Sequence, residues 1–133
     1  HMPSRRQRQM CIRDSPYVLN YLAYSWLDRN LNLDKAVKLL EKAVELEPND
    51  GYIIDSLGWA FYLTGLIDKS IFYLEKAVSM MPNDATLNDH LGDAYWKSGR
   101  RKEASSQWKR VLIIEPNFKN KEKILEKLKL GIK

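Results

Sequence analysis

A sequence repeat with a period of 34 constrains this chain more than any other feature. Pro48, Pro82 and Pro116 are evenly spaced at this period. The same step relates Leu57 to Leu91, Gly58 to Gly92, Phe61 to Tyr95, Gly65 to Gly99 and Leu74 to Trp108. Upstream, Ala36, Leu40 and Ala43 stand one such step before Ser70, Leu74 and Ala77. So many matches in one register indicate three copies of a single unit.

Each copy has the pattern of two antiparallel helices. In the central copy, Leu57, Ala60 and Phe61 form the apolar stripe of a first helix. The stripe of the second helix consists of Ile67, Ile71, Leu74, Ala77 and Val78. Gly65 permits the left-handed backbone that ends the first helix, and Pro82 ends the second because its ring has no N–H. The pattern predicts an all-α fold.

These residues resemble the tetratricopeptide repeat (TPR) family. The matching positions are Leu57-Gly58, Phe61, Gly65, Ser70, Leu74, Ala77 and Pro82, and in the next copy Leu91-Gly92, Tyr95, Gly99, Ala104, Trp108, Val111 and Pro116. Ser70 and Val111 stand where the family usually has alanine, and Leu19, Ile54 and Asn88 replace its early tryptophan. The resemblance covers residues 16–116 and implies an α-solenoid of three helix-turn-helix repeats. The stretches LNYLAYSW and DSLGWAFY are similar to the last repeats of long bacterial TPR proteins, which suggests a fragment of such a protein.

The repeats divide the chain into consecutive segments. We expect repeat 1 over residues 16–50, repeat 2 over 51–84, repeat 3 over 85–118 and a capping helix over 119–133, together one TPR domain over 16–133. Ser15 is the expected N-cap before Pro16, and the pairs Asn49-Asp50 and Asn83-Asp84 are expected to start the next repeats. The predicted second helices of repeats 1 and 3 span about 34–46 and 101–114. The apolar stripe expected for the capping helix is Phe118, Ile124, Leu125 and Leu128.

Residues 1–15 differ from the repeats in their sequence. His1-Met2 looks like a cloning scar, and RRQRQMCIRDS resembles translated sequencing-adapter read-through at the ends of metagenomic reading frames. We therefore expect residues 1–15 to be a non-native or disordered basic tail. A native basic arm is the alternative. Its arginines would also suit the groove of a neighbouring molecule, in a crystal or an oligomer.

Composition and charge exclude several classes of function for this chain. The formal charge of the chain is +5, but residues 16–116 carry 12 basic and 14 acidic side chains and sum to −2. The basic character thus lies at the two ends, and nucleic-acid binding is not expected. No apolar run approaches the length of a membrane span, and one cysteine excludes an internal disulfide. We expect a soluble chain, cytoplasmic or periplasmic, without a cofactor.

The resemblance also implies where a partner would bind. In this family the first helices line the concave side, where the exposed residues would be Tyr17, Asn20, Tyr24, Tyr52, Asp55, Trp59, Tyr62, Asp89, Asp93, Trp96 and Lys97. Leu27 and Asp28 would lie beside them. Aromatic rings offer contact area and aspartates attract Lys or Arg, so we expect a protein or peptide segment that is apolar with basic residues.

Other functions compete with this interpretation. Trp59 and Tyr24 could instead pack between neighbouring helices.

The Lys, Asn and Arg clamp by which many TPR proteins hold a C-terminal carboxylate is represented only by Asn20 and Lys97, which disfavours acidic C-terminal peptides. A structural C-terminal segment of a longer TPR scaffold, with no recognition of its own, is the alternative function. Asp89, His90 and Asp93 have helical spacing, but neither a ligand set nor a nucleophile accompanies them, so we do not expect an enzyme.

Overall fold

The structure is a computed structural model that describes residues 15–132. This part of the chain forms seven helices and belongs to the all-α class, as predicted. The helices are α2 (Pro16–Asp28), α3 (Leu33–Leu46), α4 (Gly51–Leu63), α5 (Ile67–Met80), α6 (Ala85–Lys97), α7 (Arg101–Ile114) and α8 (Lys121–Leu130). The predictions for the basic tail fall on residues 1–14, which lie outside the described residues. Within the described part, no helix is both long and apolar enough to cross a membrane.

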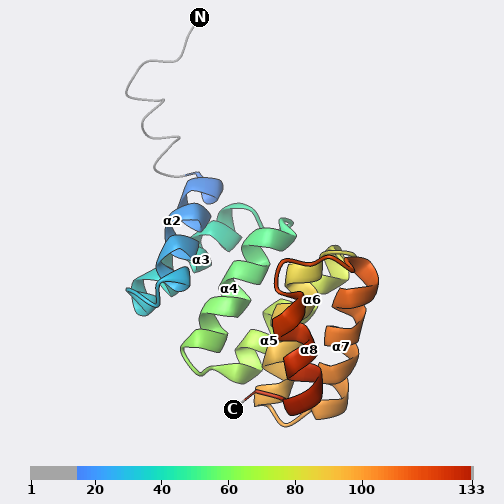
Figure 1. The fold of residues 1–133 in the computed structure, drawn as a ribbon. Coiled ribbons are helices and arrows are strands. Elements are labelled where there is room, and N and C mark those ends of the chain that lie inside the picture. The colour runs from blue at the N-terminus through green and yellow to red at the C-terminus, as the bar shows by residue number, and fades with distance from the viewer. Residues whose placement is uncertain (1–14, 133) are drawn as a thin grey trace, which may run out of the picture.

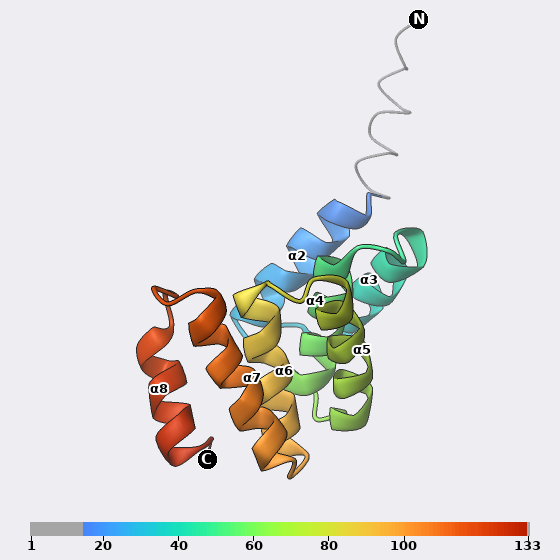
Figure 2. The same cartoon turned by 90° about the vertical axis from the view of Figure 1, so that its right-hand side faces the viewer.

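Consecutive helices pack as antiparallel pairs that stack on one another (Figures 1 and 2). The pairs are α2 with α3, α4 with α5, and α6 with α7. The second helix of each pair also packs against the first helix of the next, so that α3 contacts α4 and α5 contacts α6. The first helices α2, α4 and α6 contact one another in turn, and α8 packs on α7. This order places α2, α4 and α6 along one side of the molecule, which we call the first-helix face.

Short polar residues and glycines set the helix ends. The Asp50 carboxylate accepts hydrogen bonds from the backbone N–H of Tyr52 and Ile53, at 2.9 and 3.1 Å. Asp84 accepts one from Leu87 at 3.0 Å, and Ser15 caps α2 with Pro16 as its first residue, as predicted. Gly65 and Gly99 have φ of +84° and +89° directly after the C-caps of α4 and α6.

The longer turn of repeat 1 ends its first helix without a glycine. Instead, Asn30 and Asn32 adopt φ of 57° and 48°. Asparagine tolerates the left-handed region better than most residues, so the two asparagines take the place of the single glycine.

The core follows the repeat. Leu40, Leu74 and Trp108, which occupy one repeat position, are all fully buried. The hydroxyl of Ser70, in the family's alanine position, donates a 2.8 Å hydrogen bond to the Gly58 carbonyl across the helix pair. Its polar group is therefore satisfied in the core.

At the C-terminal end the predicted apolar stripe is mostly confirmed. Phe118 and Ile124 are buried in the same cluster as Trp108, and Leu128 packs against that cluster. The prediction for Leu125 was wrong, because its side chain is 42% exposed. Leu125 directly follows the fully buried Ile124, and a helix turns adjacent residues about 100° apart, so both cannot face the core.

Candidate functional site

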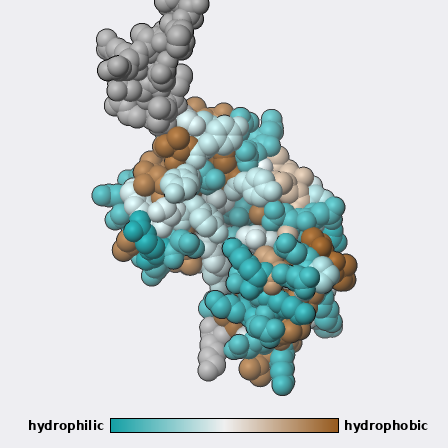
Figure 3. Space-filling model, turned by 45° about the horizontal axis from the view of Figure 1, so that its top comes forward, coloured by the Kyte–Doolittle hydropathy of each residue, from teal (hydrophilic) through white to brown (hydrophobic). Residues whose placement is uncertain are grey.

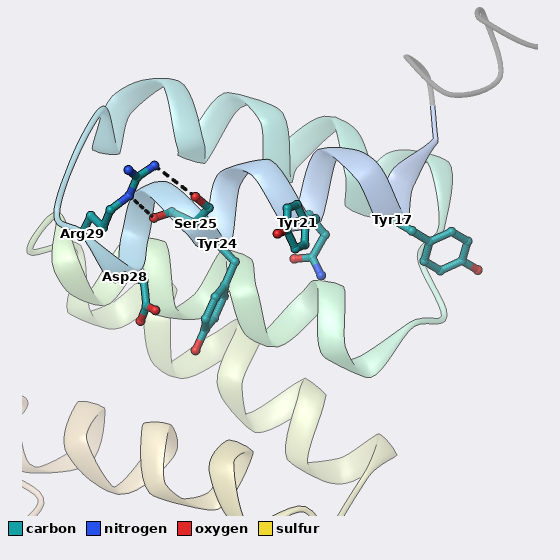
Figure 4. Close-up of a pocket in the computed structure, with 7 residues that line it drawn as sticks. Tyr17, Tyr21, Tyr24, Ser25, Asp28 and Arg29 are labelled. Atoms are coloured by element: carbon teal, nitrogen blue, oxygen red, sulfur yellow. Dashed lines mark hydrogen bonds between the residues drawn. The ribbon is translucent and has the colours of Figure 1, made fainter.

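Three of the predicted site residues line an open hollow on α2. Its volume is about 610 Å³, and its walls are Tyr17, Asn20, Tyr21, Tyr24, Ser25, Asp28 and Arg29. Figure 4 shows Tyr24 and Asp28 pointing in the same direction, over α4, whereas the Arg29 guanidinium turns back and donates to the carbonyl and hydroxyl of Ser25. The buried Asn20 Oδ1 has no hydrogen-bond partner within residues 15–132. The hollow thus offers phenols and a carboxylate, and the unpaired amide oxygen of Asn20 is buried beside them.

Tyr21 is a member of this hollow that the sequence reasoning missed. Its side chain is 79% exposed. It follows Tyr17 by four positions, a spacing that puts both on one side of a helix, so the signal was present in the sequence.

An aromatic stack occupies the middle of the first-helix face. The ring of Trp59 stacks on Tyr62, with centroids 4.5 Å apart, and on His90 of α6, at 4.1 Å. Nδ1 of His90 lies 3.0 and 3.1 Å from the two carboxylate oxygens of Asp55. Trp59 and Tyr62 are only partly buried, while the Asp55–His90 pair beneath them is buried. The stack therefore joins α4 to α6 and still presents aromatic surface.

The pKa of His90 reflects opposing effects. Burial alone would lower it, but the charge of Asp55, its hydrogen bond, and the charges of Asp89 and Asp93 together raise it above the ordinary value. A raised pKa favours an imidazolium that pairs with Asp55 and stacks on Trp59.

Two tyrosines of the face lie in a negative field. Burial and the charges of Asp55 and Asp28 raise the pKa of Tyr24 to about 12. Burial and the charges of Asp93 and Asp89 raise the pKa of Tyr62 to about 12. Carboxylates thus act on the face from α2, α4 and α6 together.

The C-terminal end of the face is covered by α8. Nζ of Lys127 lies 2.7 Å from Asp89 Oδ1 and 2.8 Å from Asp93 Oδ1. Asp93 also accepts a 3.1 Å hydrogen bond from the indole N–H of Trp108. The Trp96 indole donates a 2.9 Å hydrogen bond to the carbonyl of Ile132. A second hollow, of about 520 Å³, lies between Tyr62 on α4 and the C-terminal half of α8 with the residues that follow it.

The predicted exposure was therefore wrong for the three aspartates. Asp55, Asp89 and Asp93 are each 8% exposed or less, because His90 and Lys127 of the same chain pair with them. Leu27 is also buried rather than exposed. The missed partner Lys127 lies one repeat step after Asp93, so the repeat period is the signal that could have indicated it.

Two further predicted residues lie away from the stack. Tyr52 is 51% exposed at the start of α4, and the charge of Asp84 is the main cause of its raised pKa. It lines a separate hollow with the turn between α5 and α6. Lys97 is the exposed last residue of α6. Asp89, His90 and Asp93 take part in ion pairs, and residues 15–132 hold no group of three or more His, Cys, Asp or Glu suited to a metal ion.

Helix pairs that repeat with one register and stack through their first helices define an α-solenoid of the helix-turn-helix kind. The chain contains tetratricopeptide repeats. The model of the tetratricopeptide repeat family matches residues 31–50, in the second part of the predicted repeat 1, and residues 54–84, within the predicted repeat 2.

Comparisons with individual proteins agree with this assignment. The TPR repeat-containing protein PA4667 of Pseudomonas aeruginosa is 40% identical over 52 residues, which are 39% of this chain and 9% of that relative's length. The crystal structure of MamA has a TM-score of 0.78 at 20% identity, over 95% of this chain and 71% of MamA. The type III secretion chaperone SycD of Yersinia enterocolitica, in complex with a peptide of the translocator YopD, has a TM-score of 0.73 at 19% identity, over 84% of this chain and 87% of SycD. At these identities the two structures establish the fold alone.

Proposed function

We propose that the first-helix face is a concave groove that binds a segment of a partner protein, extended or helical, which is apolar and carries basic residues. The observation that supports this most is the combination of accessible rings and buried carboxylates. Tyr17, Tyr24, Trp59 and Tyr62 keep part of their surface open. The carboxylates of Asp55, Asp89 and Asp93 are buried, and their charges act on Tyr24 and Tyr62. Aromatic rings supply most of the contact energy in such surfaces.

The charges of the face favour a cationic ligand. Asp89 and Asp93 share the single ammonium of Lys127, so one negative charge of this group is not neutralised. Asp28 adds an exposed carboxylate beside Tyr24. A Lys or Arg of the ligand that lies over Tyr24 would gain from the ring and from these carboxylates.

The comparison with SycD supports a peptide as the ligand. In that protein the same fold is seen together with a peptide of YopD. The two chains are only 19% identical, so the chemistry of the ligand follows from the residues of this chain and not from SycD.

A peptide array would test the proposal directly. Apolar peptides that carry Lys or Arg, Asp or Glu, or no charge are probed with the purified chain, and the best peptides are then titrated. We expect selection of the Lys and Arg peptides and weaker binding as salt increases. Tyr24→Ala should lower the affinity about 5-fold or more, the usual loss for a central aromatic contact.

Phe72→Ala is the matched control for the groove. Phe72 is an exposed aromatic residue on α5, a second helix, so its loss should leave the affinity unchanged. Equal losses from the two substitutions, or selection of acidic peptides, would overturn the proposal. If no peptide is bound at all, the result would favour the alternative, a scaffold segment without recognition of its own.

A further inference from the structure

The outer side of α2 exposes apolar residues whose equivalents in the other repeats are buried. Val18 is 42% exposed and Leu22 is 41% exposed. Their equivalents are Ile53 and Leu57 in α4, and Leu87 and Leu91 in α6, and all four are at most 2% exposed. Figure 3 shows hydrophobic atoms on the surface at the end of the molecule where the described chain begins.

In repeats 2 and 3 the structure shows which helix covers the residue equivalent to Val18. Ile53 is buried in one cluster with Ala43 of the preceding helix α3, and Leu87 in one cluster with Ala77 of the preceding helix α5. Ala43 and Ala77 occupy the same repeat position. A small residue there lets the preceding helix approach closely enough to seal the apolar side chain from water.

The exposure of Tyr21 indicates that the first helix of a preceding pair would also pack on α2. Its equivalent in α6 is His90, which is buried against α4 through its contacts with Asp55 and Trp59. Tyr21 has the corresponding place on α2 but is largely exposed. The second helix of a preceding pair would thus cover Val18 and Leu22, and its first helix would cover Tyr21.

We propose that the surface formed by Val18, Tyr21 and Leu22 is an interface for one further TPR helix pair, packed on α2 as α2 and α3 pack on α4. The partner's second helix is expected to carry Ala at the position of Ala43 and Ala77, followed by Val or a similar residue as in Val44 and Val78. A second folded copy of this chain does not fit, because Ala43, Ala77 and the equivalent Val111 are all fully buried in their own cores. The added pair would form one wall of the hollow on α2.

The test joins a copy of residues 51–84 directly ahead of Pro16, in place of residues 1–15. Asp84 of the copy then takes the N-cap position of Ser15, and the register of the repeat continues into repeat 1. We expect the extended chain to unfold in a single transition, with a Tm at least about 5 °C above that of the original chain. Hydrogen exchange of the amides in α2 should slow at the same time.

The double substitution Val18→Glu and Leu22→Glu, made in α2, identifies the interface. In the original chain it should change the Tm little, since both side chains are exposed, whereas in the extended chain it should abolish the gain. Ile113→Glu, at an exposed position of α7, is the control and should have the same small effect in both chains. Two separate transitions, unchanged exchange in α2, or a gain that survives the double substitution would each overturn the proposal.

Discussion

At the scale of single residues, Gly92 and Trp108 form a contact that leaves no room for a methyl group. A Cβ placed on Gly92 would lie 2.5 Å from Nε1 and 2.6 Å from Cδ1 of Trp108, and the ring is fully buried. Gly92→Ala should therefore lower the free energy of unfolding by about 1–3 kcal/mol, even though alanine has the higher helix propensity. Urea denaturation followed by circular dichroism would measure this loss.

The first repeat supplies a control for this prediction. There the same two positions hold Ala23 and Leu40, both fully buried. Gly92→Ala should therefore destabilise a Trp108→Leu background much less than it destabilises the natural chain. Equal effects in the two backgrounds would contradict a clash with the indole.

His90 gives stability a defined pH dependence. Asp55 on α4, with Asp89 and Asp93 on α6, raises the pKa of His90 above its unfolded value despite burial. Folding then favours the protonated ring, so this contribution is complete below about pH 6.5 and is lost as the pH rises through the folded pKa. Melting temperatures between pH 6 and pH 9 should fall, and His90→Gln should remove that slope. A variant with the same slope as the natural chain would contradict it.

At the scale of elements, one ion-pair group ties α8 to the first-helix face. Lys127→Met keeps an apolar stem but leaves Asp89 and Asp93 close together without a cation. We expect a loss of about 1–3 kcal/mol at neutral pH, measured by urea denaturation. The loss should shrink at acidic pH, because burial and the charge of Asp89 raise the pKa of Asp93, so that it takes up a proton early.

Lys129→Met is the control for the charge itself. Lys129 lies on the exposed side of α8, so its replacement should change the stability by less than about 0.5 kcal/mol. Losses of the same size at positions 127 and 129 would show that the ion pairs do not hold α8 in place.

The positions of the helices could be predicted from the sequence, but the side-chain contacts between different helices could not. Caps such as Asp50 and Asp84, and glycines such as Gly65, fix helix ends through local backbone chemistry, so the sequence alone locates them. The ion pairs of Asp55, Asp89 and Asp93 depend instead on the side chains of His90 and Lys127, which lie at least one repeat step away. Spacing within one helix places a carboxylate on a face but does not say which residue of another helix will cover it.

At the scale of the whole molecule, stability should vary along the stack. Among the described helices, α4 has the first helices α2 and α6 on its two sides, and α6 lies between α4 and Lys127 of α8. Within residues 15–132, α2 has a first-helix neighbour on one side only. Native-state hydrogen exchange, followed by mass spectrometry, should therefore show faster exchange in α2 than in α4 and α6. Uniform protection along residues 15–132 would indicate a fully cooperative unit instead.

Removal of residues 117–133 should lower the Tm strongly or cause aggregation. This segment carries Phe118 and Ile124, which share a core cluster with Trp108, and the backbone carbonyl that accepts the Trp96 hydrogen bond. Deletion of residues 1–14, which lie outside the described part, is expected from the sequence to change the Tm little. Differential scanning fluorimetry and light scattering would compare the two truncations, and equal effects would contradict this division of the chain.

The three helix crossings of this chain fill the same repeat positions with three different pairs of residues. Repeat 1 combines Ala23 with Leu40, repeat 2 combines Gly58 with Leu74, and repeat 3 combines Gly92 with Trp108. A Cβ on Gly58 would lie 2.8 Å from the side chain of Leu74, and a Cβ on Gly92 would lie 2.5 Å from the indole of Trp108. The large residue of the second helix thus fills the space that the glycine leaves on the first helix. A substitution at one member of such a pair therefore requires a matching change at the other.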